Sequence, residues 1–128
     1  MKTVLSTEHA PKAIGPYSQG IQAGDLLFLS GQLPIDPAVG KIVAADIEGQ
    51  TKQSLTNIRA ILESAGCTMD NVVKTTVFLK DINDFGKMNE VYKEFFTEGN
   101  YPARSAIQVA AIPQDARLEI EVVALKKA

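Results

Sequence analysis

The chain has 128 residues, of which 45% are hydrophobic and 22% are charged, as expected for one soluble globular domain with one core. Its 13 Lys and Arg residues nearly balance its 15 Asp and Glu residues without forming a basic block, which argues against nucleic acid as a partner. No apolar run could span a bilayer and the first residues are too polar for a signal peptide, so we expect a cytoplasmic protein without membrane contact.

Short extended segments separated by turns are predicted for the first thirty residues. They are residues 3–6, residues 14–17, and a hairpin of residues 19–23 and 26–30 around Gly24-Asp25. A helix is then predicted from Asp46 to Ala65, because apolar residues recur along one helical face. Asp46 is a suitable N-cap and Gly66 a suitable stop, so the ends of this helix are also predicted.

The second half of the chain predicts one more helix and three more strands. Residues 72–79 are β-branched and aromatic, which favours a strand, and a helix is expected from Ile82 to about Phe96. After a turn at residues 99–102, two closing strands at residues 104–109 and 117–125 are joined by a loop that contains Pro113.

The alternation of side chains in strands predicts which residues share a face of the sheet. One face of the sheet is expected to hold Ser105, Ile107 and Val109 together with the apolar residues Leu118, Ile120, Val122 and Ala124 of the neighbouring strand. The other face then holds Arg104, Ala106, Gln108, Glu119, Glu121, Val123 and Leu125. The strand at residues 72–79 is expected to place Val73, Val77 and Leu79 on one face and Val72, Thr76 and Phe78 on the other.

Both faces of this sheet are partly apolar, yet two helices can cover only one of them. The face that holds Arg104 and Glu119 is therefore expected to be buried against another copy of the chain. This reasoning predicts a homo-oligomer with its site near a subunit boundary.

Arg104 and Glu119 are the candidate chemical groups. A guanidinium offers a rigid fork of donors for a carboxylate, and a glutamate can accept a proton or hold a water molecule. Together they indicate a small anionic substrate. The plainer alternative is a surface ion pair of Arg104 with Glu119 or Glu121.

Other reactive residues are few. Cys67 is the only cysteine and His9 the only histidine, and no clustered carboxylate spacing is visible, so we expect no metal and no other cofactor. Cys67 is expected to be a small buried residue rather than a nucleophile.

Five motifs in order along the chain give a more specific indication. They are Ala13 to Gln19 (AIGPYSQ), Leu29 to Pro34 (LSGQLP), Asn89 to Tyr92 (NEVY), Pro102 to Ser105 (PARS), and Leu118 to Glu121 (LEIE). With these motifs the chain resembles, over nearly its whole length, the Rid (YjgF-type) family of enamine and imine deaminases. The resemblance implies one Rid-type domain over residues 1–128.

The implied fold is α+β and chorismate mutase-like, with a single mixed sheet, two helices on one face, and three subunits in a trimer. Arg104 matches the arginine that binds the substrate carboxylate, and Glu119 matches the acid that positions the hydrolytic water. The further residues implied to bind substrate are Tyr17, Ser30, Gly31, Asn89 and Ala106. The implied reaction is hydrolysis of 2-aminoacrylate and related enamines or imines, which pyridoxal phosphate enzymes release, to 2-keto acids and ammonia.

Several alternatives remain open at this stage. Gly15-Pro16-Tyr17 is either a rigid turn or part of a neighbour's pocket, Ser30-Gly31 is either a strand end or a pocket wall, and Asn89 either faces solvent or the site. Ala106 stands where many family members have cysteine, which argues against thiol chemistry. A non-catalytic protein that binds small carboxylates is the alternative function.

Overall fold

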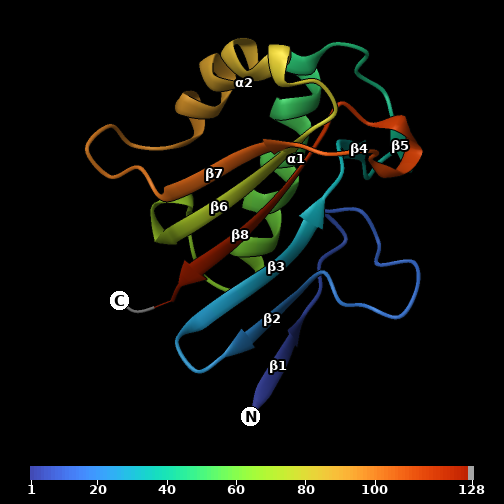
Figure 1. Ribbon diagram of the computed structural model, residues 1–128. Coiled ribbons are helices and arrows are strands. Elements are labelled where there is room, and N and C mark those ends of the chain that lie inside the picture. The colour runs from blue at the N-terminus through green and yellow to red at the C-terminus, as the bar shows by residue number, and fades with distance from the viewer. Residues whose placement is uncertain (127–128) are drawn as a thin grey trace.

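The computed structural model describes residues 1–126 and contains a six-stranded sheet with helices on one side (Figure 1). The strands lie in the order β1-β2-β3-β8-β6-β7, and β6 and β7 are parallel whereas the other neighbouring pairs are antiparallel. The strands are β1 (Lys2–Leu5), β2 (Gly20–Ala23), β3 (Leu26–Gln32), β6 (Val72–Leu79), β7 (Ala103–Gln108) and β8 (Leu118–Leu125). The mixed α+β sheet expected from the sequence is confirmed.

Helix α1 (Ile47–Ser64) begins and ends where its caps predict. The Asp46 side chain accepts a hydrogen bond from the Gly49 amide at 2.8 Å, and Gly66 has a φ of 77° just after the last turn. The apolar face of α1 is fully buried against the sheet, with Leu55, Ile58 and Ile61 all at 0% exposure. This face forms the centre of the core.

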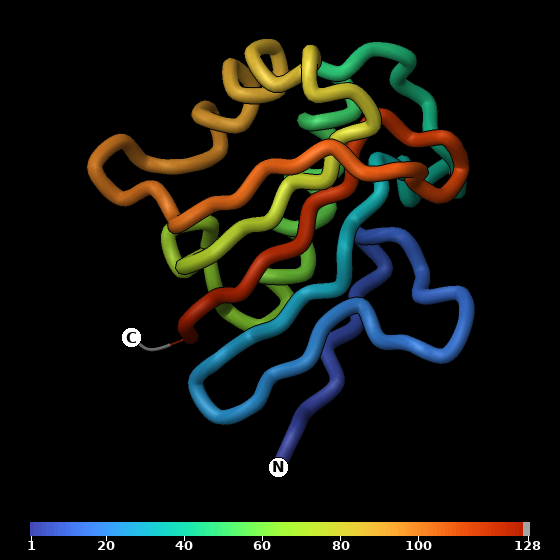
Figure 2. The backbone as a smooth tube through the Cα atoms, viewed as in Figure 1, coloured from blue at the N-terminus to red at the C-terminus, as the bar shows by residue number. Residues whose placement is uncertain are grey.

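The second helical segment consists of three short pieces. A 3₁₀ turn at Ile82–Asp84 leads into α2 (Phe85–Tyr92), and a second 3₁₀ turn follows at Lys93–Phe95. Helix α2 packs against α1 and buries Met88 and Tyr92. Figure 2 shows α1 behind the sheet, whereas the face toward the viewer carries no helix.

Two details of the predicted architecture are wrong. Residues 14–17 form an irregular loop rather than a strand, and the side chain of buried Gln19 holds the preceding segment by donating to the carbonyls of Thr7 and Pro11. The sheet is also not single, because β4 (Ile35–Asp36) and β5 (Lys41–Ile42) form a separate two-stranded sheet. Strands of two residues are too short to produce a recognisable alternation.

The predicted match of strand faces is wrong in a way that affects the site. Strand register pairs Thr75 with both Arg104 and Val122, so these three side chains point toward the helices. The same register pairs Phe78 with both Ile107 and Glu119, which places these three on the open face. Arg104 and Glu119 of one chain therefore lie on opposite faces of the sheet.

The assignment of Val72 and Val73 is wrong for a related reason. A register shift lies between Val72 and Lys74, and it leaves Val72 buried and Val73 exposed. A bulge of this kind inserts one residue and reverses the alternation beyond it.

No helix within residues 1–126 has the length and apolar character needed to cross a membrane.

Candidate functional site

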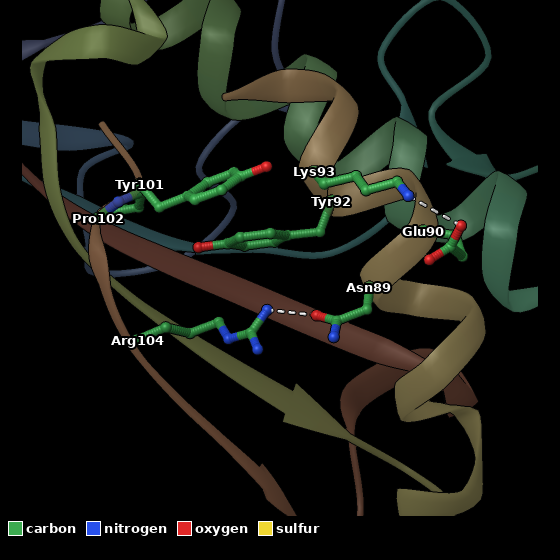
Figure 3. Close-up of a pocket in the computed structure, with 7 residues that line it drawn as sticks. All are labelled: Asn89, Glu90, Tyr92, Lys93, Tyr101, Pro102 and Arg104. Carbon is green, nitrogen blue, oxygen red and sulfur yellow. Dashed lines mark hydrogen bonds and ion pairs between the residues drawn. The ribbon is translucent and has the colours of Figure 1, made fainter. Parts of the chain in front are cut away.

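Arg104 lies in a cleft of about 430 Å³ between the edge strand β7 and helix α2 with the 3₁₀ turn that follows it (Figure 3). Its side chain is half-buried and points to the helix-covered side of the sheet. The other residues that line this cleft are Asn89, Glu90, Tyr92, Lys93, Tyr101 and Pro102. We call this space the arginine cleft.

The guanidinium of Arg104 is surrounded by neutral partners. Its Nη1 donates to Asn89 Oδ1 at 2.5 Å, and its Cζ lies 4.8 Å from the ring centroid of Tyr92 and 5.2 Å from that of Phe85. These distances are typical of cation–π contacts. No Asp or Glu of residues 1–126 forms an ion pair with Arg104. The structure thus contradicts the alternative of a pair with Glu119 or Glu121 within one chain.

Tyr92 is fixed from the interior of the protein. Its hydroxyl forms a hydrogen bond of 2.8 Å with Thr75 Oγ1, and both residues are buried. Desolvation by burial raises the pKa of Tyr92, against smaller opposing effects of the Thr75 hydrogen bond and the Arg104 charge. The phenol therefore remains neutral beneath the guanidinium at physiological pH.

The sequence analysis missed Phe85, Tyr92 and Thr75 as neighbours of the site. A signal was present, because Phe85, Asn89 and Tyr92 are spaced by four and three residues and so share one face of a helix. Of the two alternatives for Asn89, the structure favours the site, because Asn89 accepts a hydrogen bond from Arg104 and lines the same cleft.

Glu119 lies in a second cleft of about 510 Å³, on the other side of the sheet. Three residues singled out in the sequence analysis also line it, namely Tyr17, Ser30 and Gly31. Ser30 donates its hydroxyl to the Ser18 carbonyl at 2.6 Å, which joins the end of β3 to the loop that carries Tyr17. We call this space the glutamate cleft, and it unites the first two motifs of the chain with the last.

The carboxyl group of Glu119 packs directly on the backbone of Gly31. A Cβ atom at Gly31 would lie 2.8 Å from both Cδ and Oε1 of Glu119, closer than non-bonded atoms approach. Desolvation by burial raises the pKa of Glu119, and the negative charge of Glu121 raises it further. A glutamate with a raised pKa is a stronger base than an ordinary glutamate, so it is better suited to take up and return a proton.

Replacing Gly31 by alanine is expected to displace the Glu119 carboxyl group and to lower kcat by on the order of 10²-fold, the cost of about 1 Å of misplacement. The measurement is the steady-state rate on the substrate proposed below. Gly86→Ala is the matched control, because a Cβ at Gly86 meets no atom within 4 Å. Equal activity of the two variants would contradict a positioning role for Gly31.

The remaining sequence candidates lie away from both clefts. Ala106 is half-buried on the same face as Arg104 and packs against the core, where it lines neither cleft. Cys67 is buried at 3% exposure and His9 is exposed. Within residues 1–126, no three His, Cys, Asp or Glu side chains are grouped so as to share a metal ion.

The fold and the two clefts define a small α+β protein with a cleft that holds Arg104 on one face of its sheet and a cleft that holds Glu119 on the other. The model of the Endoribonuclease L-PSP family matches residues 7–126. The chain therefore belongs to this family, which is also called the YjgF/Rid family.

Relatives support the same assignment over full length. The chain is 58% identical to a RutC family protein of Pyrococcus horikoshii over 127 residues, which cover 99% of the chain and 100% of the relative. It is 49% identical to the 2-iminobutanoate/2-iminopropanoate deaminase of Salmonella typhimurium over 129 residues, with 99% and 100% covered. Among solved structures, Escherichia coli TdcF with bound serine has a TM-score of 0.92 at 45% identity, with 98% and 99% covered.

Proposed function

We propose that this protein hydrolyses 2-aminoacrylate and related 2-imino acids to 2-keto acids and ammonia. The observation that carries the proposal is the Arg104 guanidinium, which lies half-buried in a cleft without an anionic partner among residues 1–126. A half-buried cation without a counter-ion has lost part of its hydration, so this cleft favours an anionic ligand. Relatives named 2-iminobutanoate/2-iminopropanoate deaminase and reactive intermediate deaminase support an imino acid as that ligand.

The proposed reaction needs only the two charged groups and water. Arg104 binds the carboxylate of the imino acid and fixes the orientation of C2. 2-Aminoacrylate, an enamine, first tautomerises to its imine, and the imine nitrogen is protonated. Glu119 takes a proton from a water molecule as the water oxygen bonds to C2 and the C=N π electrons pass to nitrogen, which gives a neutral carbinolamine. Glu119 returns this proton to the nitrogen and then takes the hydroxyl proton as the C–N bond breaks and the C=O bond forms, so that ammonia and the 2-keto acid are released.

This mechanism requires more than one subunit. Arg104 and Glu119 of one chain lie on opposite faces of its sheet and in different clefts, so they serve one substrate only if two chains meet. The open face offers an apolar surface for such contact. Its exposed members include Val4, Leu26, Phe28, Ile107 and Leu125. We propose a homotrimer, as the family resemblance implies, with the arginine cleft of one subunit completed by the glutamate cleft of the next.

Replacing Ile107 by lysine is expected to dissociate this assembly and to abolish activity, although Arg104 and Glu119 are unchanged. Ile107 is 47% exposed on the open face, and a buried unpaired charge there would oppose association. Sedimentation equilibrium is expected to give the mass of three chains for wild type and of one for the variant. Val39→Lys, in the turn between β4 and β5 at 53% exposure, is the control and should stay assembled.

The pH dependence of kcat/KM is expected to show an acidic limb above the usual pKa of glutamate, because Glu119 must be ionised to act as a base and its pKa is raised. Glu121→Gln removes the neighbouring negative charge, lowers the pKa of Glu119 and moves the limb to lower pH. Glu98→Gln, at another exposed position, is the control and should leave the limb in place. A limb that Glu121→Gln does not move would contradict Glu119 as the titrating group.

The proposed function is tested by a coupled assay in which a pyridoxal phosphate dehydratase supplies 2-aminoacrylate. Wild-type protein should release pyruvate and ammonia faster than the spontaneous reaction does. Tight binding of 2-keto acids without any acceleration would instead support the alternative, a non-catalytic protein that binds small carboxylates. The crystal structure of Escherichia coli TdcF with bound serine shows that one relative binds a small amino acid.

Ribonuclease activity is a second candidate only because the family model carries the description Endoribonuclease L-PSP. The net charge of −2 and the lack of a basic block in the sequence disfavour an RNA-binding surface. Cleavage of RNA at physiological salt that persists in an Arg104→Ala variant would favour this activity over the proposed one.

A further inference from the structure

Going further, and resting on the proposed function, we infer that Thr75, Tyr92 and Asn89 form a clamp that presents the Nε–Nη2 edge of the Arg104 guanidinium to the substrate carboxylate. These three are positioning residues, since they act on the substrate through Arg104. Thr75 is fully buried and lines neither cleft, so it acts only through its neighbours. Tyr92 and Asn89 line the arginine cleft, and there they contact the guanidinium.

Three contacts link Thr75, Tyr92 and Arg104 to one another. Thr75 and Arg104 are direct neighbours in the parallel pair of β6 and β7, and both side chains point to the same face. The Thr75 hydroxyl holds the Tyr92 hydroxyl at 2.8 Å, and the Tyr92 ring in turn lies 4.8 Å from Arg104 Cζ. The ring can move away from the guanidinium only if this buried hydrogen bond breaks, which would leave two polar groups without partners.

Asn89 determines which edge of the guanidinium is free. A carboxylate can pair with an arginine end-on, through Nη1 and Nη2, or side-on, through Nε and Nη2. Figure 3 shows the Asn89 amide beyond the tip of the guanidinium, where it accepts from Nη1 at 2.5 Å. Nε and Nη2 have no hydrogen-bond partner in the described part of the chain, so the side-on edge remains for the ligand.

The clamp also explains how a long side chain on an edge strand can bind a small ligand well. A free arginine loses rotamer entropy when a ligand fixes it, and that loss weakens binding. Here the ring of Tyr92 and the amide of Asn89 hold the guanidinium before the ligand arrives. The clamp therefore contributes to affinity for the carboxylate, and not to the chemical step.

The first test measures the dissociation constant of pyruvate, and of uncharged pyruvamide as a control ligand, by calorimetry. Tyr92→Leu removes the ring and is expected to weaken pyruvate binding roughly tenfold, which lies between the values for an exposed and a desolvated cation–π contact, without a comparable effect on pyruvamide. Tyr92→Phe keeps the ring and should bind pyruvate within about twofold of wild type. In turnover, the loss in Tyr92→Leu should appear in KM with kcat nearly unchanged.

Thr75→Val tests the buried hydrogen bond. It leaves the Tyr92 hydroxyl without a partner and is expected to weaken pyruvate binding, whereas the double variant Thr75→Val/Tyr92→Phe removes both hydroxyls and should restore it. A purely structural role would change the thermal unfolding midpoint of these variants but not the ratio of pyruvate to pyruvamide affinity.

The second test observes the Nε–H resonances of arginine by ¹⁵N NMR. The chain has only three arginines, so Arg104→Lys assigns the signal of interest among Arg59, Arg104 and Arg117. Pyruvate is expected to shift the Arg104 Nε–H resonance of wild type, because side-on pairing engages that proton. An unmoved resonance at saturating pyruvate, or wild-type pyruvate affinity in Tyr92→Leu, would overturn the clamp and leave the proposed function intact. No binding of pyruvate by wild type would overturn both.

Discussion

Replacing Arg104 by alanine is expected to lower kcat/KM for 2-aminoacrylate by at least ~30-fold. Removal of one partner of a hydrogen-bonded charge pair costs roughly 2–5 kcal/mol, and each 1.4 kcal/mol is tenfold. Lysine should restore little of this activity, because a compact ammonium group cannot reproduce the planar fork and would not stack on Tyr92 as a guanidinium does. The measurement is the initial rate of pyruvate release from a freshly generated pulse of 2-aminoacrylate.

The matched control for this change is Arg59→Ala. Arg59 is an exposed arginine whose Cζ also lies over an aromatic ring, 5.3 Å from the centroid of Phe95, but it lines neither cleft. Its removal therefore tests for general effects of losing a positive charge and a cation–π contact. Full activity in Arg104→Lys would show that the fork geometry is irrelevant, and full activity in Arg104→Ala would show that the substrate carboxylate is bound elsewhere.

Replacing Glu119 by glutamine is expected to lower kcat by about 10²–10⁴-fold, which is the usual contribution of a general base. Glutamine has nearly the same shape as glutamate, so it should still pack on Gly31 and preserve the cleft. The affinity for pyruvate should change little, because the carboxylate is bound by Arg104. The combined result separates the roles of the two residues, with Arg104 in binding and Glu119 in the chemical step.

Mixing the two inactive variants tests whether two subunits share one site. In an assembly of Arg104→Ala and Glu119→Gln chains, an intact Arg104 meets an intact Glu119 of a neighbouring chain in about one cleft of four after random mixing. We therefore expect co-refolded chains to regain activity that neither variant has alone. Mixtures that stay inactive although mixed assemblies form would contradict a site divided between chains, and with it the proposed trimer arrangement.

Much of the fold could be predicted because its signals are local. The capped amphipathic helix α1, the hairpin of β2 and β3, and the strands β6 to β8 each show a periodicity that a few residues define. The small sheet of β4 and β5 was missed because its strands are too short to show alternation. The prediction of a strand at residues 14–17 is wrong because a loop held by the buried Gln19 side chain leaves no local signature in the sequence.

The family motifs, most of the secondary structure and the two charged residues proposed for the reaction can all be recognised in the amino-acid sequence. The folded chain is needed to see that Arg104 and Glu119 point to opposite faces of the sheet. It is needed equally to see that Tyr92, held by Thr75, and Asn89 contact the guanidinium. Alternation shows which residues within one strand share a face. Whether a given residue of β7 lies on the same face as a given residue of β8 depends on how each strand is aligned with the strand between them. Here that strand is β6, which pairs with both β7 and β8 and so places the two charges on different sides of the sheet.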